Sequence, residues 1–184
     1  MSLQSIIQED GELIYIPGLF KDYSADEFIN GIDWQHNDIK IFGKEYKEPR
    51  LTAWFGPAYR YSSIQWKAEK IPTLLLPVLE EVNKHSSIDL NAVLLNYYRD
   101  GADGMGWHRD NESEIDQACI ASISLGTPRP IDFRHRESRK KVRILLEHGS
   151  LLLMKNCQQH WEHQIPKSKR IHDPRVNLTF RKMN

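Results

Sequence analysis

Short strand-like segments separated by turn residues fill the chain from Asp89 to the C-terminus, and they constrain the fold more than any other feature. Runs of about four to eight apolar, β-branched and aromatic residues bounded by Gly, Pro, Asn and Asp are typical of strands. Within 176–180 (VNLTF), apolar and polar residues alternate as they do in a half-buried strand. The predicted strands are 89–98, 118–125, 130–135, 142–147, 150–155 and 175–182.

Two helices are predicted before this region. Ser24-Ala25-Asp26-Glu27 is a capping-box pattern, which predicts a short helix ending at about Ile32. Apolar residues within 68–86 predict a second helix, in which Pro72 fits the first turn and Pro77 predicts a kink or a later start. Many short strands after an N-terminal helical part are typical of an α+β protein with a jelly-roll or β-sandwich core. At 184 residues, the chain is most simply a single domain.

Composition excludes several classes of protein. Forty per cent of the residues are hydrophobic, and without an apolar run of about 18 residues a membrane span is not expected. The N-terminus lacks the basic-then-apolar pattern of an export signal, so we expect an intracellular protein, cytoplasmic in a bacterium and nuclear in a eukaryote. Cys119 and Cys157 lie in apolar runs, and we interpret them as buried reduced thiols without a disulfide or metal role.

The net charge is zero, but the charges are unevenly distributed. Residues 129–184 hold fourteen Lys/Arg and five Asp/Glu, a net charge of about +9, so residues 1–128 carry about −9. The basic residues concentrate in 134–141 and 167–170. This asymmetry indicates a polyanionic partner, although solvated loops between strands would produce the same two clusters.

His108-Arg109-Asp110, followed 53 residues after Asp110 by His163, has the composition of a metal site. Two imidazoles and one carboxylate that leave positions open are the ligand set of non-haem Fe(II) oxygen chemistry. Arg175 and Arg181 suit an anionic co-substrate, because a guanidinium matches a carboxylate bidentately.

This metal pattern has competitors within the chain. His36-Asn37-Asp38 is a second His-x-Asp, which we interpret as a surface coincidence. Strand context favours His108, which follows the predicted strand 89–98 across a Gly-rich stretch, and His163, which lies shortly after 150–155. The other candidates for the distal ligand are His148, His160 and His172. A non-catalytic jelly-roll module with a structural metal is a further alternative, although structural zinc usually has four protein ligands.

Three motifs carry a specific resemblance: 108–112 (HRDNE), 161–167 (WEHQIPK) and 174–181 (PRVNLTFR). They resemble the motifs of AlkB-type Fe(II)/2-oxoglutarate dioxygenases, which repair N-alkylated nucleobases, and the similarity runs from about Gly43 to the C-terminus. The resemblance implies helices and a nucleotide-recognition lid in about 1–88 and a double-stranded β-helix (jelly-roll) core in about 89–184. The implied iron ligands are His108, Asp110 and His163, and the implied 2-oxoglutarate contacts are Asn96, Tyr98, Arg175 and Arg181.

The resemblance implies oxidative demethylation of N-alkylated bases in DNA. In that reaction, Fe(II) and O2 couple decarboxylation of 2-oxoglutarate to hydroxylation of the N-methyl group, and formaldehyde is released. An RNA demethylase or a protein oxygenase would use the same chemistry. The basic C-terminal third disfavours a protein substrate, whereas RNA stays open.

A target base in a duplex must be flipped out and held between flat or apolar side chains. Residues 49–62 resemble the family's lid, where Tyr61 is the stacking candidate, while Trp54 and Phe55 more simply pack beneath it. Residues 41–44 resemble the hydrophobic finger of the members that prefer double-stranded DNA, although Phe42 also fits a buried strand. Predicted substrate contacts are Phe42, Gly43, Tyr59, Tyr61, Ser62 and Glu112.

The two basic clusters match, in position, the loops that grip the DNA backbone in those duplex-preferring members. Asn111 departs from them, because they often carry a second Asp at this position. We expect a monomer that binds alkylated DNA, preferably double-stranded. Predicted backbone contacts are Arg139, Lys140, Lys141, Lys167, Lys169 and Arg170.

Overall fold

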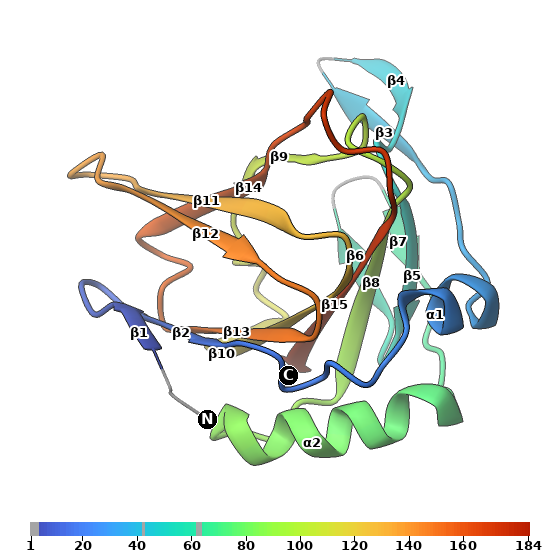
Figure 1. The fold of residues 1–184 in the computed structure, drawn as a ribbon, viewed down its shortest axis with the longest axis horizontal. Helices are drawn as coiled ribbons and strands as arrows, with labels where there is room; N and C mark the ends of the chain where they lie inside the picture. Colours follow the sequence, from blue (N-terminus) through green and yellow to red (C-terminus); the bar gives the residue numbers. More distant parts are fainter. Residues whose placement is uncertain (1–3, 42, 62–63) are drawn as a thin grey trace.

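Two antiparallel sheets face each other in the computed structural model, which describes residues 4–41, 43–61 and 64–184 (Figure 1). The larger sheet has seven strands in the order β1 (Gln4–Ile7), β2 (Glu12–Ile16), β13 (Ser150–Lys155), β10 (Ile115–Gly126), β15 (Arg175–Met183), β8 (Ala92–Tyr98) and β5 (Leu51–Phe55). The smaller sheet has the order β12 (Lys141–Leu146), β11 (Arg129–His135), β14 (Trp161–Ile165) and β9 (Met105–His108). This mostly β architecture is consistent with the expected jelly-roll core.

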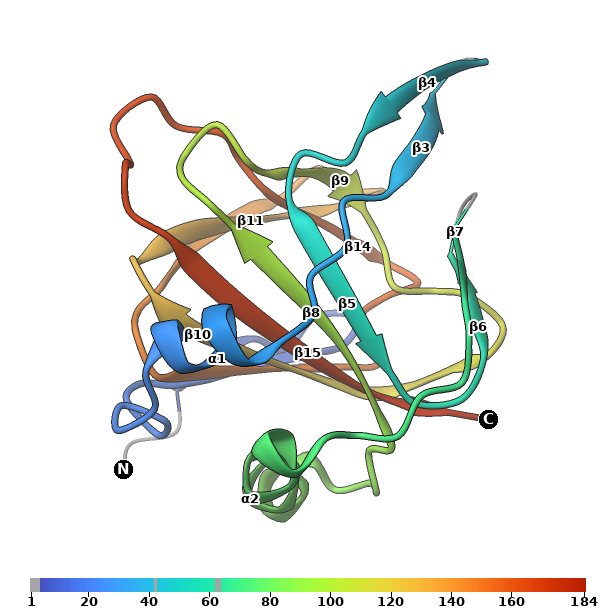
Figure 2. The ribbon, with the colours of Figure 1, turned by 90° about the vertical axis from the view of Figure 1, so that its right-hand side faces the viewer.

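Two hairpins lie outside these sheets. One joins β3 (Asp38–Ile41) to β4 (Lys44–Lys47), and the other joins β6 (Tyr59–Tyr61) to β7 (Ile64–Trp66). Figure 2 shows that the β3–β4 hairpin projects away from both sheets. All four residues of β4 are exposed, so this hairpin presents a strand to solvent.

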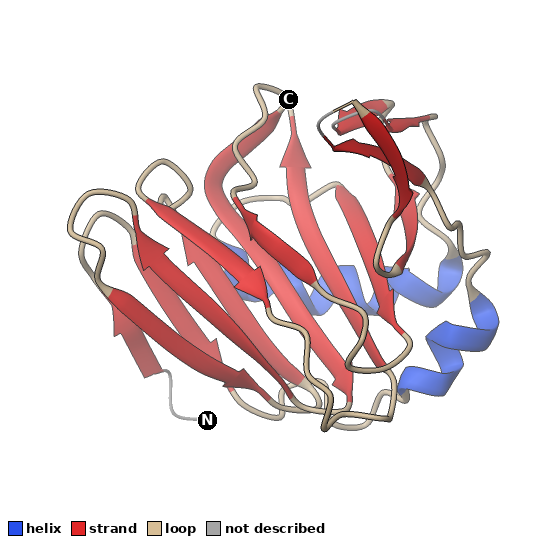
Figure 3. Cartoon of the chain, turned by 90° about the horizontal axis from the view of Figure 1, so that it is seen from above, coloured by secondary structure: helices blue, strands red, loops and turns tan. Residues whose placement is uncertain are grey.

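The helices lie along the outer face of the larger sheet (Figure 3). Helix α1 (Ala25–Gly31) begins where the capping pattern predicts, and the Ser24 hydroxyl accepts a hydrogen bond of 3.2 Å from the Asp26 amide. The second helix starts late: a 3₁₀ turn at Thr73–Leu75 leads into α2 (Leu76–Ser86), with Pro77 in its first turn. Of the two alternatives that Pro77 predicts, the later start is confirmed, and residues 68–72 are not helical.

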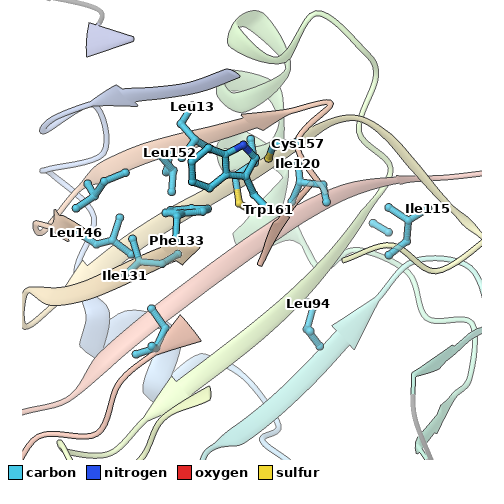
Figure 4. Close-up of a cluster of buried hydrophobic side chains, with 14 of the residues drawn as sticks. Leu13, Leu94, Ile115, Ile120, Ile131, Phe133, Leu146, Leu152, Cys157 and Trp161 are labelled. Atoms are coloured by element: carbon cyan, nitrogen blue, oxygen red, sulfur yellow. The ribbon is translucent and has the colours of Figure 1, made fainter. Parts of the chain in front are cut away.

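Apolar and polar residues alternate along β15, and the two faces of this strand point into two different parts of the interior. Val176, Leu178 and Phe180 pack with residues of α1 and α2 in the outer core, where side chains such as Phe28 are fully buried. The second core lies between the sheets and includes Phe133 and Trp161 (Figure 4). The intervening residues of β15 face this inner side, and the half-buried interpretation of 176–180 is therefore wrong because both faces of the strand are covered. These buried polar residues are Arg175, Asn177, Thr179 and Arg181.

The first half of the chain contributes more strands than its sequence predicts. Strands β1, β2 and β5 belong to the larger sheet, where β2 pairs with β13 and β5 pairs with β8. The predicted strands of the second half all form, with ends within about three residues of those expected. Cys119 and Cys157 are buried free thiols, as predicted. No helix within the described ranges is long and apolar enough to cross a membrane.

Candidate metal centre and co-substrate pocket

Strands β9 and β14 bring the three predicted metal ligands together. His108 is the last residue of β9, Asp110 follows two positions later, and His163 lies in the middle of β14 as the register partner of His108. The ligand atoms of the three side chains all lie within 4.8 Å of one another. His163 Nε2 lies 3.8 Å from Asp110 Oδ2, and the two imidazole centroids are 4.2 Å apart. The spacing is compatible with one ion bound by all three residues.

A hydrogen bond fixes the tautomer of His108. Its Nδ1 lies 2.8 Å from the carbonyl oxygen of Gly106. Because a carbonyl only accepts, Nδ1 must carry the proton and donate it, which leaves the lone pair of Nε2 available to a metal. A backbone carbonyl in this position is the usual partner that orients a metal-binding imidazole.

Burial and charge set the protonation states that a metal requires. Burial lowers the pKa of His163 to about 3, with His108 acting in the same direction, and burial also lowers the pKa of His108. Burial alone would raise the pKa of Asp110, but the Arg181 guanidinium and the two histidines together lower it to about 2. Neutral imidazoles beside an ionised carboxylate are the forms that bind divalent cations. The donor set therefore fits Fe(II).

Asp10, His135 and His160 form a second group with ligand atoms within 4.8 Å of one another, but its hydrogen bonds disfavour a metal. The Ser138 amide donates to His135 Nδ1 at 3.1 Å, so His135 Nε2 carries the proton and donates to Asp10 Oδ2 at 3.0 Å. A metal on Nε2 would have to displace that proton while Nδ1 still accepts a hydrogen bond. We interpret this group as a structural contact between the β1–β2 turn and β11.

The predicted co-substrate residues lie on β8 and β15, which are neighbours in the larger sheet. Arg175 pairs in register with Tyr98, and Asn177 pairs with Asn96. Asn96, Tyr98, Arg175 and Arg181 line one cavity together with the three candidate metal ligands. The structure thus brings together all seven residues predicted for iron and 2-oxoglutarate, although their roles stay predictions.

Arg175 and Arg181 are buried cations with unused donors. Arg175 is 1% exposed, and its Nη2 donates to Ser124 Oγ at 2.8 Å, whereas its Nε and Nη1 have no hydrogen-bond partner among the described residues. Burial lowers the pKa of Arg175 to about 10. Arg181 donates to Asp110 Oδ1 at 2.7 Å, and its own Nε and Nη1 are also unpaired within the described chain. Buried guanidinium donors without a partner fit an anionic ligand such as a dicarboxylate.

Sequence reasoning missed two buried arginines near this cavity. Arg50 lines it and donates to Asn96 Oδ1 at 2.7 Å. Arg129 is 1% exposed and donates to the backbone carbonyls of Asp100, Asp103 and Pro166. Only the tripeptide 49–51 (PRL) within the lid-like segment marks Arg50, and no local signal marks Arg129, because every partner of both is distant in sequence except Glu48.

The predicted substrate contacts are only partly placed. Phe42 and Ser62 lie outside the described residues, and Tyr61 is placed only as the last residue of β6. Gly43 lies in the turn between β3 and β4 at a φ of +79°, where a side chain would be strained although space is available.

Two further substrate predictions fall on residues beside the metal triad. Tyr59 is 3% exposed and stacks on Trp54 with ring centroids 4.8 Å apart. Burial raises the pKa of Glu112, while a hydrogen bond with Tyr59 acts in the opposite direction. Tyr59 is thus packed in the interior against Trp54, and its predicted contact with the base stays a prediction. Trp54 is buried and Phe55 packs in the outer core, as the packing interpretation of both residues predicts.

The six predicted backbone-contact residues are exposed on two connections. Arg139, Lys140 and Lys141 lie at the β11–β12 hairpin, where Lys140 pairs with Glu9 at 2.9 Å. Lys167, Lys169 and Arg170 lie in the β14–β15 connection. The structure leaves all six side chains accessible to a partner in solution.

Comparison with known proteins identifies the family. Residues 12–181 match the 2OG-Fe(II) oxygenase superfamily. The chain belongs to this superfamily. The expected cofactors Fe(II), 2-oxoglutarate and O2 are therefore confirmed at the level of the 2OG-Fe(II) oxygenases, and the geometry of the triad agrees with them.

Two relatives show which members of the 2OG-Fe(II) oxygenase superfamily this chain resembles. The chain is 41% identical over 162 residues to the human protein named DNA oxidative demethylase ALKBH2, covering 79% of this chain and 60% of the relative. It is 33% identical over 176 residues to mouse alpha-ketoglutarate-dependent dioxygenase alkB homolog 3, covering 87% of this chain and 60% of the relative. The chain thus spans about 60% of the length of these two relatives. These matches confirm the resemblance that the three motifs indicate.

A solved structure supports the fold. The structure described as OsALKBH1 superimposes with a TM-score of 0.64, covering 92% of this chain and 97% of that chain at 15% sequence identity. At this identity, the superposition shows a shared architecture and nothing about substrate.

Proposed function

We propose that this protein is an Fe(II)/2-oxoglutarate-dependent dioxygenase that demethylates N-alkylated bases in DNA, with duplex DNA preferred. The observation that carries the chemistry is the shared cavity in which the His108–Asp110–His163 triad lies beside the unpaired donors of Arg175. The relatives named DNA oxidative demethylase support the substrate class. We also propose that the protein acts as a monomer.

Each residue of the cavity has a distinct task in this proposal. His108, Asp110 and His163 would hold the metal, and Arg181 keeps Asp110 ionised. Arg175 and the unpaired donors of Arg181 would bind the carboxylates of 2-oxoglutarate, with Asn96 and Tyr98 orienting the rest of that molecule. Bound iron, 2-oxoglutarate and O2 supply the oxidation that converts the N-methyl group to a hydroxymethyl group, which leaves as formaldehyde.

Apolar side chains surround this polar centre. They restrict water around the reacting groups, which strengthens the hydrogen bonds of Arg175 and Arg181 and limits side reactions. The apolar residues that line the cavity are Leu94, Met105, Ile131, Leu146, Met154 and Ile165.

The projecting β3–β4 hairpin and the lid-like segment supply the proposed substrate side. Phe42, which precedes Gly43 in the sequence, would fill the gap left by the flipped base, and Tyr61 would stack on that base. Tyr59, Ser62 and Glu112 would complete the base pocket. The exposed basic residues of the β11–β12 and β14–β15 connections would contact phosphates.

Two assays test the proposal in sequence. The wild-type protein with Fe(II) and 2-oxoglutarate should form succinate, and His108→Ala should abolish it, whereas Asp38→Asn in the second His-x-Asp should not. Formaldehyde release should then be measured from methyladenine in duplex DNA, single-stranded DNA and RNA of matched sequence. We expect the highest rate with duplex, and Phe42→Ala should reduce that rate far more than the single-strand rate. A strong preference for RNA would overturn the DNA assignment. Absence of succinate would overturn the proposal that the protein is a 2-oxoglutarate-dependent dioxygenase.

A further inference from the structure

A buried ion pair connects the projecting hairpin to the co-substrate pocket. The side chain of Arg50 is 4% exposed and that of Glu48 is 2% exposed, and Arg50 Nη2 lies 3.0 Å from Glu48 Oε1. The Nε–H of the same guanidinium donates to Asn96 Oδ1 at 2.7 Å. One guanidinium thus contacts two different acceptor residues, one before β5 and one in β8.

At the hairpin end, Glu48 fixes the base of β3 and β4. Asn37 immediately precedes β3 and Glu48 immediately follows β4, and the Glu48 amide donates to the Asn37 carbonyl at 2.9 Å. Glu48 Oε2 accepts from Thr52 Oγ1 at 3.0 Å, and Thr52 Oγ1 in turn accepts from Asn37 Nδ2 at 2.8 Å. The carboxylate therefore joins both ends of the hairpin to the start of strand β5.

At the cavity end, Arg50 determines which way the Asn96 amide faces. A guanidinium only donates, so the atom of Asn96 that it contacts must be the oxygen. The Asn96 nitrogen then donates one hydrogen to Asn177 Oδ1 at 3.2 Å, which leaves its second hydrogen for the cavity. The reversed amide would present an oxygen to an anionic co-substrate and would be repulsive.

Asn177 holds the other side of this arrangement. Its Nδ2 donates to Ser122 Oγ at 2.8 Å, and its Oδ1 also accepts from Thr179 Oγ1 at 2.9 Å. The series from Glu48 through Arg50 and Asn96 to Asn177 is consequently continuous and buried throughout. Buried hydrogen bonds of this kind hold their members in a single arrangement, because an unsatisfied partner is costly.

We propose that Arg50 is a positioning residue with two separable tasks: it orients the Asn96 amide toward 2-oxoglutarate, and through Glu48 it holds the β3–β4 hairpin at the angle required for a duplex. The second task rests on the proposed function, whereas the first requires only that the cavity binds 2-oxoglutarate. Arg50 therefore links co-substrate affinity to duplex affinity without contacting the base.

Three substitutions separate the two tasks. Arg50→Met removes both bonds and should weaken 2-oxoglutarate and duplex binding by about tenfold each, the typical effect of losing a charge-assisted hydrogen bond. Arg50→Lys keeps a cation for Glu48 but lacks the Nε–H, so it should weaken 2-oxoglutarate binding and leave duplex binding unchanged. Glu48→Gln keeps the hydrogen bond between Arg50 and Asn96, so it should weaken duplex binding and leave 2-oxoglutarate binding unchanged. Asp38→Asn, which alters an exposed ion pair with Lys47 on the same hairpin, is the matched control.

Binding rather than turnover is the readout. Affinity for 2-oxoglutarate is measured calorimetrically on the Mn(II)-loaded protein without O2, and duplex affinity by fluorescence anisotropy of a labelled methylated duplex. A double-mutant cycle adds Asn96→Ala, in which Arg50→Lys should have no further effect on 2-oxoglutarate affinity. An equal effect of Arg50→Lys with and without Asn96 would show a merely structural role and overturn the proposal.

The outcomes also separate this inference from the proposed function. If the wild type binds 2-oxoglutarate but neither binds nor demethylates methylated DNA, the proposed function fails while the cycle between Arg50 and Asn96 still decides the first task. If the wild type demethylates duplex DNA and the Arg50 variants bind both ligands normally, only the inference fails. Should Arg50→Met not fold, Arg50→Lys and Glu48→Gln carry the same decision.

Discussion

Arg181 Nη2 donates a 2.7 Å hydrogen bond to Asp110 Oδ1, and both side chains are 4% exposed. The guanidinium thereby holds a metal ligand in its ionised form and fixes one of its two oxygens. Removing one partner of a buried pair leaves an uncompensated charge, which costs about 3–5 kcal/mol.

Arg181→Met should therefore lower the free energy of unfolding of the metal-free protein by about 3 kcal/mol at neutral pH. Because the folded pKa of Asp110 is about 2, the stabilisation is complete above the unfolded value of about 3.9 and is lost as the pH falls toward 2. Urea unfolding from pH 7 to pH 3 measures this. A difference between wild type and variant that stays constant below pH 4 would contradict the ion-pair explanation.

Arg175→Met, in contrast, should hardly change the stability of the ligand-free protein but should weaken co-substrate binding. Since two of its nitrogen donors are buried and unpaired in the described chain, its loss should change the stability of the ligand-free protein by no more than about 1 kcal/mol, the value of its bond to Ser124. The wild type should gain about 2.7 kcal/mol from 2-oxoglutarate at 100 times its Kd, and the variant should gain little at that concentration. Thermal unfolding with and without 2-oxoglutarate compares the two. An equal gain in both proteins would mean that Arg175 does not bind the co-substrate.

The basic residues of the β14–β15 connection should act on phosphates rather than on bases. Replacing Lys167, Lys169 and Arg170 with Gln should weaken binding to all sequences and reduce the salt slope of affinity by about 1 for each lost contact. Anisotropy titrations between low and moderate salt give this slope. If the slope is unchanged, the connection lies outside the interface.

Gly101, in the loop after β8, permits the β14–β15 connection to pack closely against that loop. A Cβ at Gly101 would lie 1.9 Å from the carbonyl oxygen of Ser168, whereas a Cβ at Gly106 would meet no atom within 4 Å. Gly101→Ala should destabilise the protein by about 1–3 kcal/mol and weaken nucleic-acid binding, because the backbone of the connection must move. Gly106→Ala is the matched control and should be near neutral in chemical denaturation. Equal effects would show that steric overlap is not the cause.

The two cysteines should be inert in the native protein. Burial raises the pKa of Cys119 to about 11 and that of Cys157 to about 12, so neither forms much thiolate at pH 8. A disulfide reagent such as DTNB should react with no thiol in the native state and with both in denaturant. Rapid native labelling of either thiol would show that its strand opens readily.

The sequence predicts the central strands and the metal ligands because both have local signals. Strands such as β10 and β13 are rich in β-branched and apolar residues, and the ligands lie within recognisable motifs. Strands β9 (MGWH) and β14 (WEHQI) escaped prediction because functional side chains replace the residues that typically indicate a strand.

Contacts between distant residues account for most of what the sequence did not predict. Arg50 and Asn96 are 46 positions apart, and Arg181 and Asp110 are 71 positions apart. Nothing in either local segment indicates its partner. The pairing of β5 with β8 brings Arg50 near Asn96, and the facing of the two sheets brings Arg181 of β15 to Asp110, which follows β9. The half-buried interpretation of 176–180 failed for a related reason, since polar residues in that strand are buried and line the candidate co-substrate pocket.

The register of His108 with His163 has a mechanical consequence. Strand β9 lies at the edge of the smaller sheet and pairs with β14 through two register positions, His163 with His108 and Ile165 with Met105. An ion bound by both histidines would therefore cross-link an edge strand to its neighbour. A slip of one residue would turn His108 to the opposite face and break the cross-link, so the metal would select the correct pairing as well as the reaction. Loss of the ion would then loosen the edge of the sheet before it disturbs the core.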